Sequence, residues 1–192
     1  MLNYNFFKSQ NDSKQLLVML HGFISDSTTY DSHIEQLSQH VNVLTIDLPG
    51  HGKDTSDMND TWDFPYIAHA LDEVLSQYDM YDVYLLGYSM GGRVALYYAL
   101  NGSVALRGLL LESTSAGIQS EADKVERVQV DAARAKVLEI AGLEIFVNDW
   151  EKLPLFRSQY ELDAEVRKAI RANRMSQNLS LIHISEPTRR RG

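Results

Sequence analysis

Four short, nearly continuous apolar runs mark the first part of the chain, at residues 16–20, 41–46, 83–86 and 109–111. Runs of this length are typical of parallel strands that are covered on both faces. Two intervening segments carry apolar side chains at helical spacing: Tyr30, Ile34, Leu37 and Val41 in one, and Phe64, Ile67, Leu71, Val74 and Tyr78 in the other. The alternation predicts a doubly wound α/β fold with a mostly parallel sheet, whose functional residues cluster beyond the carboxyl ends of the strands.

The pattern changes after residue 120. Charged helical segments follow at 123–140, 143–150 and 163–175, and no strand-like run separates them. We therefore expect a core at 1–120 and a helical cap at 121–178. Residues 179–192 fit neither pattern, and 179–189 resemble the translation of a transposase sequencing adapter. This stretch is predicted to be an artefactual tail after a gene that continued past Asn178; a natural disordered basic tail is the alternative.

Composition narrows the functional classes. A chain of 192 residues with 44% hydrophobic side chains fits one domain with its own core. The net charge of −8 argues against a nucleic-acid partner, so any positive patch must be local. The lack of cysteine excludes disulfides and thiolate metal sites and agrees with a cytoplasmic protein. The start of the chain lacks a signal-peptide pattern, and no apolar run approaches the length of a membrane span.

The strongest chemical signal is the sequence Gly87-Tyr88-Ser89-Met90-Gly91, a G-x-S-x-G pattern. It directly follows one apolar run and directly precedes a helix-like segment at 93–100. In this strand-turn-helix context it predicts a nucleophile elbow, a strained turn that exposes the serine hydroxyl above the sheet. Ser89 is therefore the predicted catalytic residue.

Two loops upstream of the elbow strengthen this interpretation. The first, at 21–23, follows one predicted strand, and the second, at 47–52, follows the next. Together with the elbow they resemble the α/β-hydrolase superfamily over residues 15–112. That resemblance implies an oxyanion hole made by the backbone amides of Phe23 and Met90. His21 and His51 lie in these loops, and we expect them to be structural hydrogen-bonding groups rather than general bases.

Several arginines have surroundings that call for a negative charge. Arg93 lies in the first turn after the elbow, where a cation opposes the helix dipole. A helical face in the cap stacks like charges at Arg167, Arg171 and Arg174. Arg127 has aspartates four residues away on each side, so an ordinary ion pair and a functional role are equally open there. An anionic ligand is one interpretation for this set, and carboxylates of the chain itself are the other.

Longer segments narrow the resemblance to one family. The extended elbow at 87–93, the segments 126–131 and 149–156, and Arg174 are similar to the 2-succinyl-6-hydroxy-2,4-cyclohexadiene-1-carboxylate synthases of menaquinone biosynthesis, over residues 3–178. The resemblance implies elimination of pyruvate from a polycarboxylate, with Ser89 as catalytic base and no metal or organic cofactor. It also implies Tyr88 and Trp150 as pocket residues, and it implies carboxylate binding by Arg93, Arg127 and Arg174. We expect these three arginines to line one cavity that opens onto Ser89.

The sequence departs from the family after the cap. Family members have a further aspartate and histidine, in the order Ser, Asp, His, after late strands that this pattern does not show. The histidine that follows Ser89 here is His183, inside the adapter-like stretch, and we do not expect it to act as the base. Two other functions stay open: an ordinary serine hydrolase acting on an ester, thioester or C–C bond, and an inactive fragment or binding module.

Overall fold

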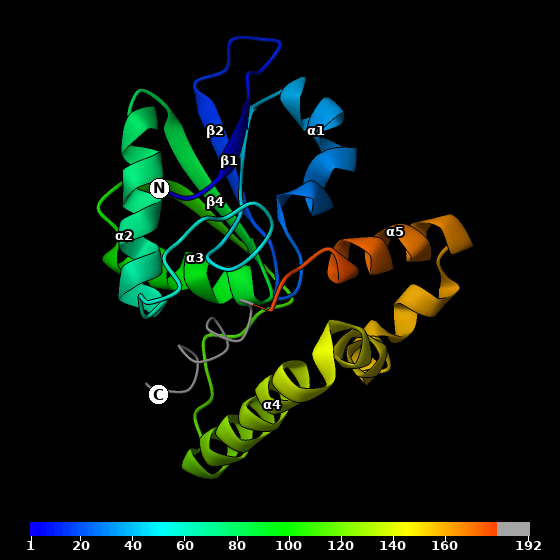
Figure 1. Ribbon diagram of the computed structural model, residues 1–192. Helices are drawn as coiled ribbons and strands as arrows, with labels where there is room; N and C mark the ends of the chain where they lie inside the picture. The colour runs from blue at the N-terminus through cyan, green and yellow to red at the C-terminus, as the bar shows by residue number, and fades with distance from the viewer. Residues whose placement is uncertain (180–192) are drawn as a thin grey trace.

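The computed structural model describes residues 1–179 and contains a five-stranded sheet (Figure 1). The strands are β1 Tyr4–Phe7, β2 Gln15–Leu20, β3 Asn42–Ile46, β4 Asp82–Tyr88 and β5 Leu106–Glu112. Their spatial order is β1-β3-β2-β4-β5. The pairs β2/β3, β2/β4 and β4/β5 are parallel, and β1 pairs antiparallel with β3. The predicted doubly wound α/β fold with a mostly parallel sheet is confirmed, and all four predicted strands are present.

The strand β1 was not predicted. It has four residues, of which Asn5 is exposed and the other three are half-buried, so it lacks the continuous apolar run of the inner strands. Its register places Tyr4 opposite Ile46 and Phe7 opposite Val43. An edge strand that is covered on one side needs fewer apolar residues than a central strand, which explains why the pattern did not reveal it.

Helices cover both faces of the sheet. On one face lie α2 Phe64–Leu75 and α3 Met90–Asn101, which pack on the inner strands in the main hydrophobic core around Leu16, Leu44 and Leu85. On the other face, the 3-10 turn η1 Ser27–Tyr30 and α1 Asp31–Ser38 cover Met19 and Val43. The figure shows α1 and α2 on opposite sides of the strands (Figure 1). The buried strand positions therefore alternate between two cores.

The observed helix ends agree only partly with those expected from the sequence pattern. Asp63 caps α2 by accepting a hydrogen bond from the Tyr66 backbone amide. A short 3-10 turn, η2 Ser76–Tyr78, continues from the end of α2. The predicted apolar stripe from Tyr30 to Val41 was too long as a helix, because α1 ends at Ser38 and Val41 lies in the connection to β3. The helix after the elbow contains the helix-like segment expected at 93–100 and runs from Met90 to Asn101.

The segment after β5 is helical. It contains α4 Glu121–Glu151, the 3-10 turn η3 Pro154–Glu161 and α5 Ala164–Met175. Gly142 breaks α4 with a φ of 84°, so the two predicted segments 123–140 and 143–150 are separate helical pieces joined at a kink. Figure 1 shows the first piece projecting away from the sheet while α5 returns toward the loop after β2. The division into a core at 1–120 and a cap at 121–178 stays a prediction.

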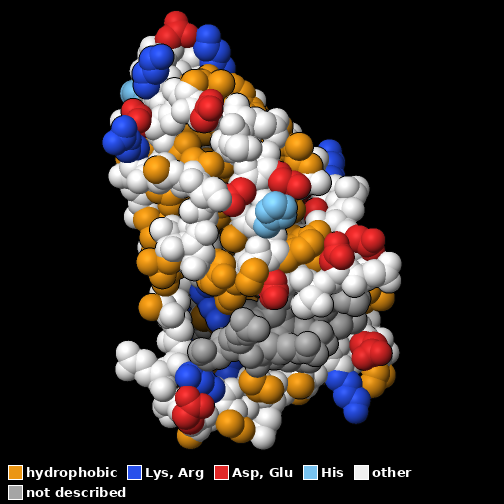
Figure 2. Space-filling view, turned by 90° about the vertical axis from the view of Figure 1, so that its left-hand side faces the viewer, with side chains coloured by type: hydrophobic (Ala, Val, Ile, Leu, Met, Phe, Trp, Pro, Cys, Tyr) orange, Lys and Arg blue, Asp and Glu red, His pale blue; other side chains and the backbone are white. Residues whose placement is uncertain are grey.

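The surface is mixed in charge. On the face shown in Figure 2, lysine and arginine side chains lie in small groups at the upper and lower ends, with acidic and apolar side chains between them. Within the described residues, no helix is long and apolar enough to cross a membrane. The prediction for residues 180–192, including His183, falls outside the described residues.

Candidate active site

Ser89 lies on the sharp turn between β4 and α3. Its backbone has φ 51° and ψ −113°, a left-handed conformation that non-glycine residues adopt at an energetic cost. The turn is held by two hydrogen bonds: the Ser89 amide donates to the Glu112 carbonyl at 2.9 Å, and the Thr114 hydroxyl donates to the Ser89 carbonyl at 2.8 Å. The predicted strand-turn-helix setting of Ser89 is therefore present.

Two glycines allow this turn to form. A β-carbon on Gly87 would lie 2.3 Å from the Gly91 carbonyl oxygen, and one on Gly91 would lie 2.4 Å from the His21 carbonyl oxygen. Both obstacles are backbone atoms, which cannot move aside as a side chain can. The spacing of glycines around Ser89 thus follows from the close approach of α3 to β4 and to the end of β2.

The two predicted oxyanion donors face the same space as Ser89. Phe23 and Met90 both line the cavity that contains Ser89. Among the described residues, neither backbone amide donates to a protein acceptor. The Met90 amide is at the first position of α3, where an N–H has no partner within the helix. Both amides are thus available to a ligand oxygen, and their role as an oxyanion hole stays a prediction.

His21 and His51 are fully buried and hydrogen bonded within the core. The Nε2 atom of His21 accepts from the Leu48 amide at 3.0 Å, and the Nε2 atom of His51 accepts from the Ile24 amide at 3.2 Å. Each Nδ1 atom lies within 3.0 Å of a backbone carbonyl, so each ring carries its proton there. Burial lowers the pKa of both rings, that of His51 to about 3. Both are structural groups held in the neutral form, as the sequence indicated.

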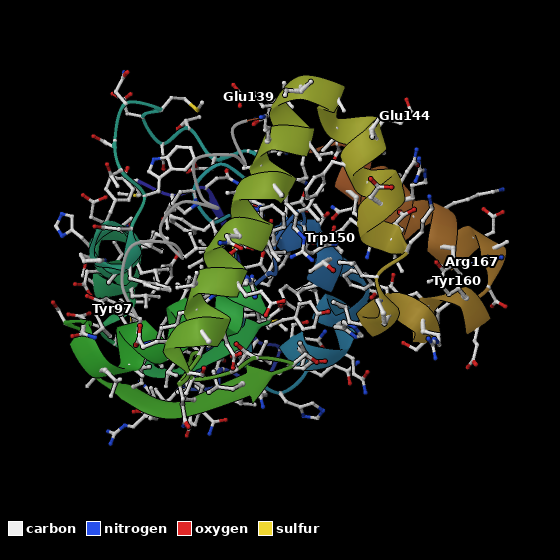
Figure 3. All side chains as sticks on the ribbon, turned by 90° about the horizontal axis from the view of Figure 1, so that it is seen from below. Tyr97, Glu139, Glu144, Trp150, Tyr160 and Arg167 are labelled. Carbon is white, nitrogen blue, oxygen red and sulfur yellow. The ribbon has the colours of Figure 1, made fainter. Side chains whose placement is uncertain are left out.

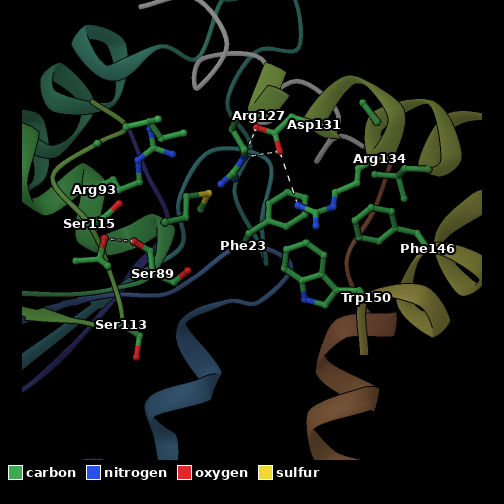
Figure 4. A pocket seen from close by; sticks show the side chains of 16 residues that line it. Phe23, Ser89, Arg93, Ser113, Ser115, Arg127, Asp131, Arg134, Phe146 and Trp150 are labelled. Atoms are coloured by element: carbon green, nitrogen blue, oxygen red, sulfur yellow. Dashed lines mark hydrogen bonds and ion pairs between the residues drawn. The ribbon is translucent and has the colours of Figure 1, made fainter. Parts of the chain in front are cut away.

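A cavity of about 440 Å³ opens at Ser89 between the core and the first piece of α4 (Figure 4). This volume suits a small-molecule ligand. Side chains and backbone from both parts of the chain line it: Phe23, Ser89, Met90, Arg93, Ser113, Thr114, Ser115, Gly117, Ile118, Arg127, Asp131, Arg134, Ala135, Leu138, Phe146 and Trp150.

Among the described residues, the charged groups that line the cavity are three arginines and one aspartate. Arg127 Nε lies 2.9 Å and 2.8 Å from the two carboxylate oxygens of the buried Asp131. Arg93 lies deeper, and burial lowers the pKa of its guanidinium, with the Arg127 charge adding to that effect. Arg93, Arg127 and Arg134 against Asp131 leave two net positive charges. An acidic protein therefore has a local positive cavity at its serine, and a ligand with two or more carboxylates complements it.

Arg174 does not line this cavity in the described structure. It is buried, donates to Glu151 Oε1 at 3.3 Å and to Gln159 Oε1 at 3.1 Å, and lies over the Phe156 ring at 4.7 Å. Glu151 also binds Arg171 at 2.8 Å. The negative charge that the arginine face of α5 requires is therefore supplied by the chain itself. The expectation that three arginines line one cavity holds for Arg93 and Arg127 and is wrong for Arg174.

The predicted pocket residues Trp150 and Tyr88 have different positions. Trp150 lines the cavity and packs in an aromatic group with Phe23 and Phe146, at ring distances of 5.3 Å and 5.7 Å. Figure 3 shows Trp150 between α4 and the core, whereas Arg167 and Tyr160 lie on the outer side. Tyr88 does not line the cavity, and its ring packs against the loop at Gly22. Its role as a pocket residue stays a prediction.

Comparison with known proteins assigns the fold family. Residues 17–182 match the Alpha/beta hydrolase family. The chain belongs to the alpha/beta hydrolase family. A solved structure of MenH from S. aureus is 54% identical, superposes with a TM-score of 0.93, and is covered over 70% of its length by 98% of this chain. A thermophilic esterase from Thermogutta terrifontis, 23% identical with a TM-score of 0.80, shows the fold alone.

Curated relatives within the alpha/beta hydrolase family carry one recurring name. The 2-succinyl-6-hydroxy-2,4-cyclohexadiene-1-carboxylate synthase from Salmonella agona (strain SL483) is 36% identical over 84% of this chain and 62% of its own length. The synthase of the same name from Enterobacter sp. (strain 638) is 31% identical over 81% of this chain and 59% of its own length. The chain thus spans about 60% of the length of the curated relatives it matches.

Sequence analysis of this alpha/beta hydrolase missed Arg134. The residue lies seven positions after Arg127 and three after Asp131, so all three share one face of α4 and reach the cavity. Helical spacing from Arg127 was the signal that could have found it. Within residues 1–179, no group of three or more His, Cys, Asp or Glu side chains lies close enough together to hold a metal ion.

Proposed function

We propose that the protein to which this chain belongs eliminates pyruvate from 2-succinyl-5-enolpyruvyl-6-hydroxy-3-cyclohexene-1-carboxylate. The product is 2-succinyl-6-hydroxy-2,4-cyclohexadiene-1-carboxylate, an intermediate of menaquinone biosynthesis. The observation that carries the proposal is a cavity with two net positive charges at a serine elbow, in a chain 54% identical to MenH from S. aureus. A neutral ester would gain little from three arginines at this place.

In this mechanism Ser89 acts as the base. It removes the proton α to the succinyl carbonyl, the C–O bond to the enolpyruvyl group breaks, and the leaving group is released as pyruvate after protonation. The Phe23 and Met90 amides stabilise the negative oxygen that develops on the succinyl carbonyl. A serine hydroxyl needs a histidine and an acid to act as a base. Because His21 and His51 are committed to backbone partners, we expect that pair to come from outside the described residues.

The arginines position the substrate. Arg93 and Arg127 bind carboxylates of the substrate directly, and Trp150 forms an apolar wall against its cyclohexene ring. Arg174 supports this wall indirectly, because it binds Glu151 and lies over Phe156, whose ring packs 5.7 Å from that of Trp150. Binding of a tricarboxylate through several guanidinium groups explains why an acidic protein has a basic cavity. Action in the cytoplasm stays a prediction.

The rival function is that of a serine hydrolase with Ser89 as nucleophile. The elbow and the two amides suit both reactions, because each builds negative charge on a carbonyl oxygen. The arginines distinguish the two functions. Arg93→Ala in the full-length protein should raise KM for the polycarboxylate about 10-fold to 100-fold, the cost of one charged hydrogen-bonded contact. Turnover of a neutral ester should change little.

The decisive experiment compares pyruvate release with ester hydrolysis by the full-length protein. We expect pyruvate release that Ser89→Ala lowers by about 1000-fold or more. The chain of residues 1–192 is assayed beside it and is expected to be inactive. Ester hydrolysis without pyruvate release establishes the hydrolase function instead, and activity of the 192-residue chain that Ser89→Ala abolishes overturns the requirement for outside partners.

A further inference from the structure

Arg134 occupies a distinct place in the cavity. Its guanidinium lies 5.3 Å from the centre of the Trp150 ring, and its side chain is about two-thirds buried. The aromatic face attracts the cation, and the N–H groups at the edge of a guanidinium in this place can donate to a carboxylate. Arg134 is thus a cation at the end of the cavity formed by the cap.

The negative charge nearby is committed mainly to another arginine. Asp131 has both oxygens within 2.9 Å of Arg127 Nε, whereas Arg134 Nη1 lies 3.8 Å from Asp131, beyond hydrogen-bond distance. Burial lowers the pKa of Arg134, and the charge of Arg127 adds to that effect. Among the described residues, Asp131 therefore compensates the charge of Arg134 only in part.

A second such cation lies at the opposite end. Arg93 extends from α3 beside Ser115, and the Arg127–Asp131 pair lies between it and Arg134 (Figure 4). The Phe64 ring, 5.9 Å away, supports its guanidinium. The cavity therefore presents two separate positive ends, with Arg127 and its partner Asp131 between them.

We propose that Arg134, stacked on Trp150, is a specificity-determining residue that binds one carboxylate of the ligand at the cap end while Arg93 binds another at the core end. The inference rests on the proposed function for the identity of the substrate and deepens it, because it assigns the ligand two anionic groups held apart. A ligand with a single carboxylate gains one contact, and a dicarboxylate of matching length gains both.

The test measures binding of small carboxylates to the full-length protein by calorimetry, without turnover. The probes are the linear dicarboxylates from malonate to suberate, with hexanoate as monocarboxylate. The variants are Arg134→Gln, Arg134→Lys and, as matched control, Lys136→Gln, which removes an exposed charge from the same helix. In the unmodified protein, affinity should rise with the separation of the carboxylates to an optimum.

We expect Arg134→Gln to weaken the best dicarboxylate at least 10-fold, to remove the dependence on length, and to weaken hexanoate less than 2-fold. Arg134→Lys keeps the charge without the planar fork and should lose part of the preference for the best dicarboxylate. If Arg134→Gln lowers the melting temperature, the comparison of Arg134→Lys with the unmodified protein is the test. Equal affinities in Arg134→Gln and the unmodified protein, or an equal loss in Lys136→Gln, overturn the proposal. Failure of pyruvate release alone counts against the proposed function and leaves this binding result standing.

Discussion

The side-chain amide of Gln177 joins two loops of the core to the end of α5: it donates to Asp26 Oδ2 at 3.0 Å and accepts from the Gly52 amide at 3.0 Å. Asn173, one turn earlier, donates to Asp26 Oδ1 at 2.9 Å. Asp26 and Gln177 are both buried, and Asp26 follows Phe23 by three residues. The cap is thereby attached beside the loop that supplies an oxyanion donor.

The contact between Gln177 and Asp26 depends on the negative charge of Asp26, and a change at Gln177 tests it. Burial by itself raises the pKa of Asp26, but hydrogen bonds from Thr28, Asn173 and Gln177 outweigh it and lower the pKa, so Asp26 is ionised at neutral pH. Gln177→Glu places a second carboxylate against it, and we expect a loss of about 2 to 3 kcal/mol in unfolding free energy at pH 7. Chemical denaturation of the full-length protein measures this loss.

Gln177→Ala is the matched control for that prediction. It removes the hydrogen bonds without adding charge and should cost about 1 kcal/mol less than Gln177→Glu. The difference between the two variants should shrink as the pH falls below 5, where carboxylates take up protons. A difference that stays constant from pH 7 to pH 4 contradicts repulsion at Asp26.

Burial of the neutral His51 ring should make the unfolding free energy fall as the pH is lowered. Its pKa is about 3 in the folded chain, because burial disfavours the charged ring, and it returns to about 6.5 on unfolding. Below pH 6.5 the unfolded state binds a proton that the folded state does not, so its contribution is present above pH 6.5 and is lost toward pH 3. The loss per pH unit approaches about 1.4 kcal/mol. Urea titrations between pH 7 and pH 4 measure it.

A variant without the titrating ring separates His51 from the carboxylates. His51→Gln retains an amide that can donate and accept, and it should flatten the dependence of unfolding free energy on pH while lowering stability at pH 7. His69→Gln, at an exposed position on α2, should leave the slope unchanged. The same slope of unfolding free energy against pH in His51→Gln and the unmodified protein would contradict the role of His51.

Gly91 tests the packing of the elbow. A β-carbon there would lie 2.4 Å from the His21 carbonyl and 2.5 Å from the Leu20 carbonyl, so Gly91→Ala forces α3 away from β2. We expect a loss of about 3 kcal/mol in unfolding free energy, together with loss of activity, because the Met90 amide moves with the helix. Gly117→Ala is the comparison, since nothing lies within 4 Å of its β-carbon and its cost arises from backbone conformation alone. Similar losses in both variants contradict the packing explanation.

Replacement of Arg174 should lower stability, whereas replacement of Arg93 should raise KM. Arg174→Ala leaves Glu151 with one arginine partner and removes the contact with Phe156, so we expect a loss of about 2 kcal/mol in stability. Arg93→Ala removes a cavity cation and should act mainly on KM. Thermal melting and steady-state kinetics on both variants separate the effects. A large rise in KM without a change in melting temperature for Arg174→Ala restores it as a direct carboxylate ligand.

The sequence revealed those features that depend on local pattern. Apolar runs identified the inner strands because a buried parallel strand must be apolar on both faces. The glycines around Ser89 identified the elbow because their positions follow from close backbone contact. Arg174 was misplaced because its ion pair with Glu151 joins residues far apart in the chain, and local spacing carries no information on such a contact. Arg134 could have been found from its helical spacing to Arg127, but its contact with Trp150 could not, because Trp150 lies beyond the kink at Gly142.

The kink in α4 also bounds a helical piece that carries cavity arginines but none of the residues around Ser89. Ser89 and the amides of Phe23 and Met90 lie shortly after the core strands β4 and β2, whereas Arg127 and Arg134 lie on the piece of α4 that ends at Gly142. Substitutions along that arm can alter which anions are accepted while the turn that holds the serine stays unchanged. The choice of anionic ligand in this architecture can therefore be changed through one helix of the cavity wall, without changing the residues that hold the serine.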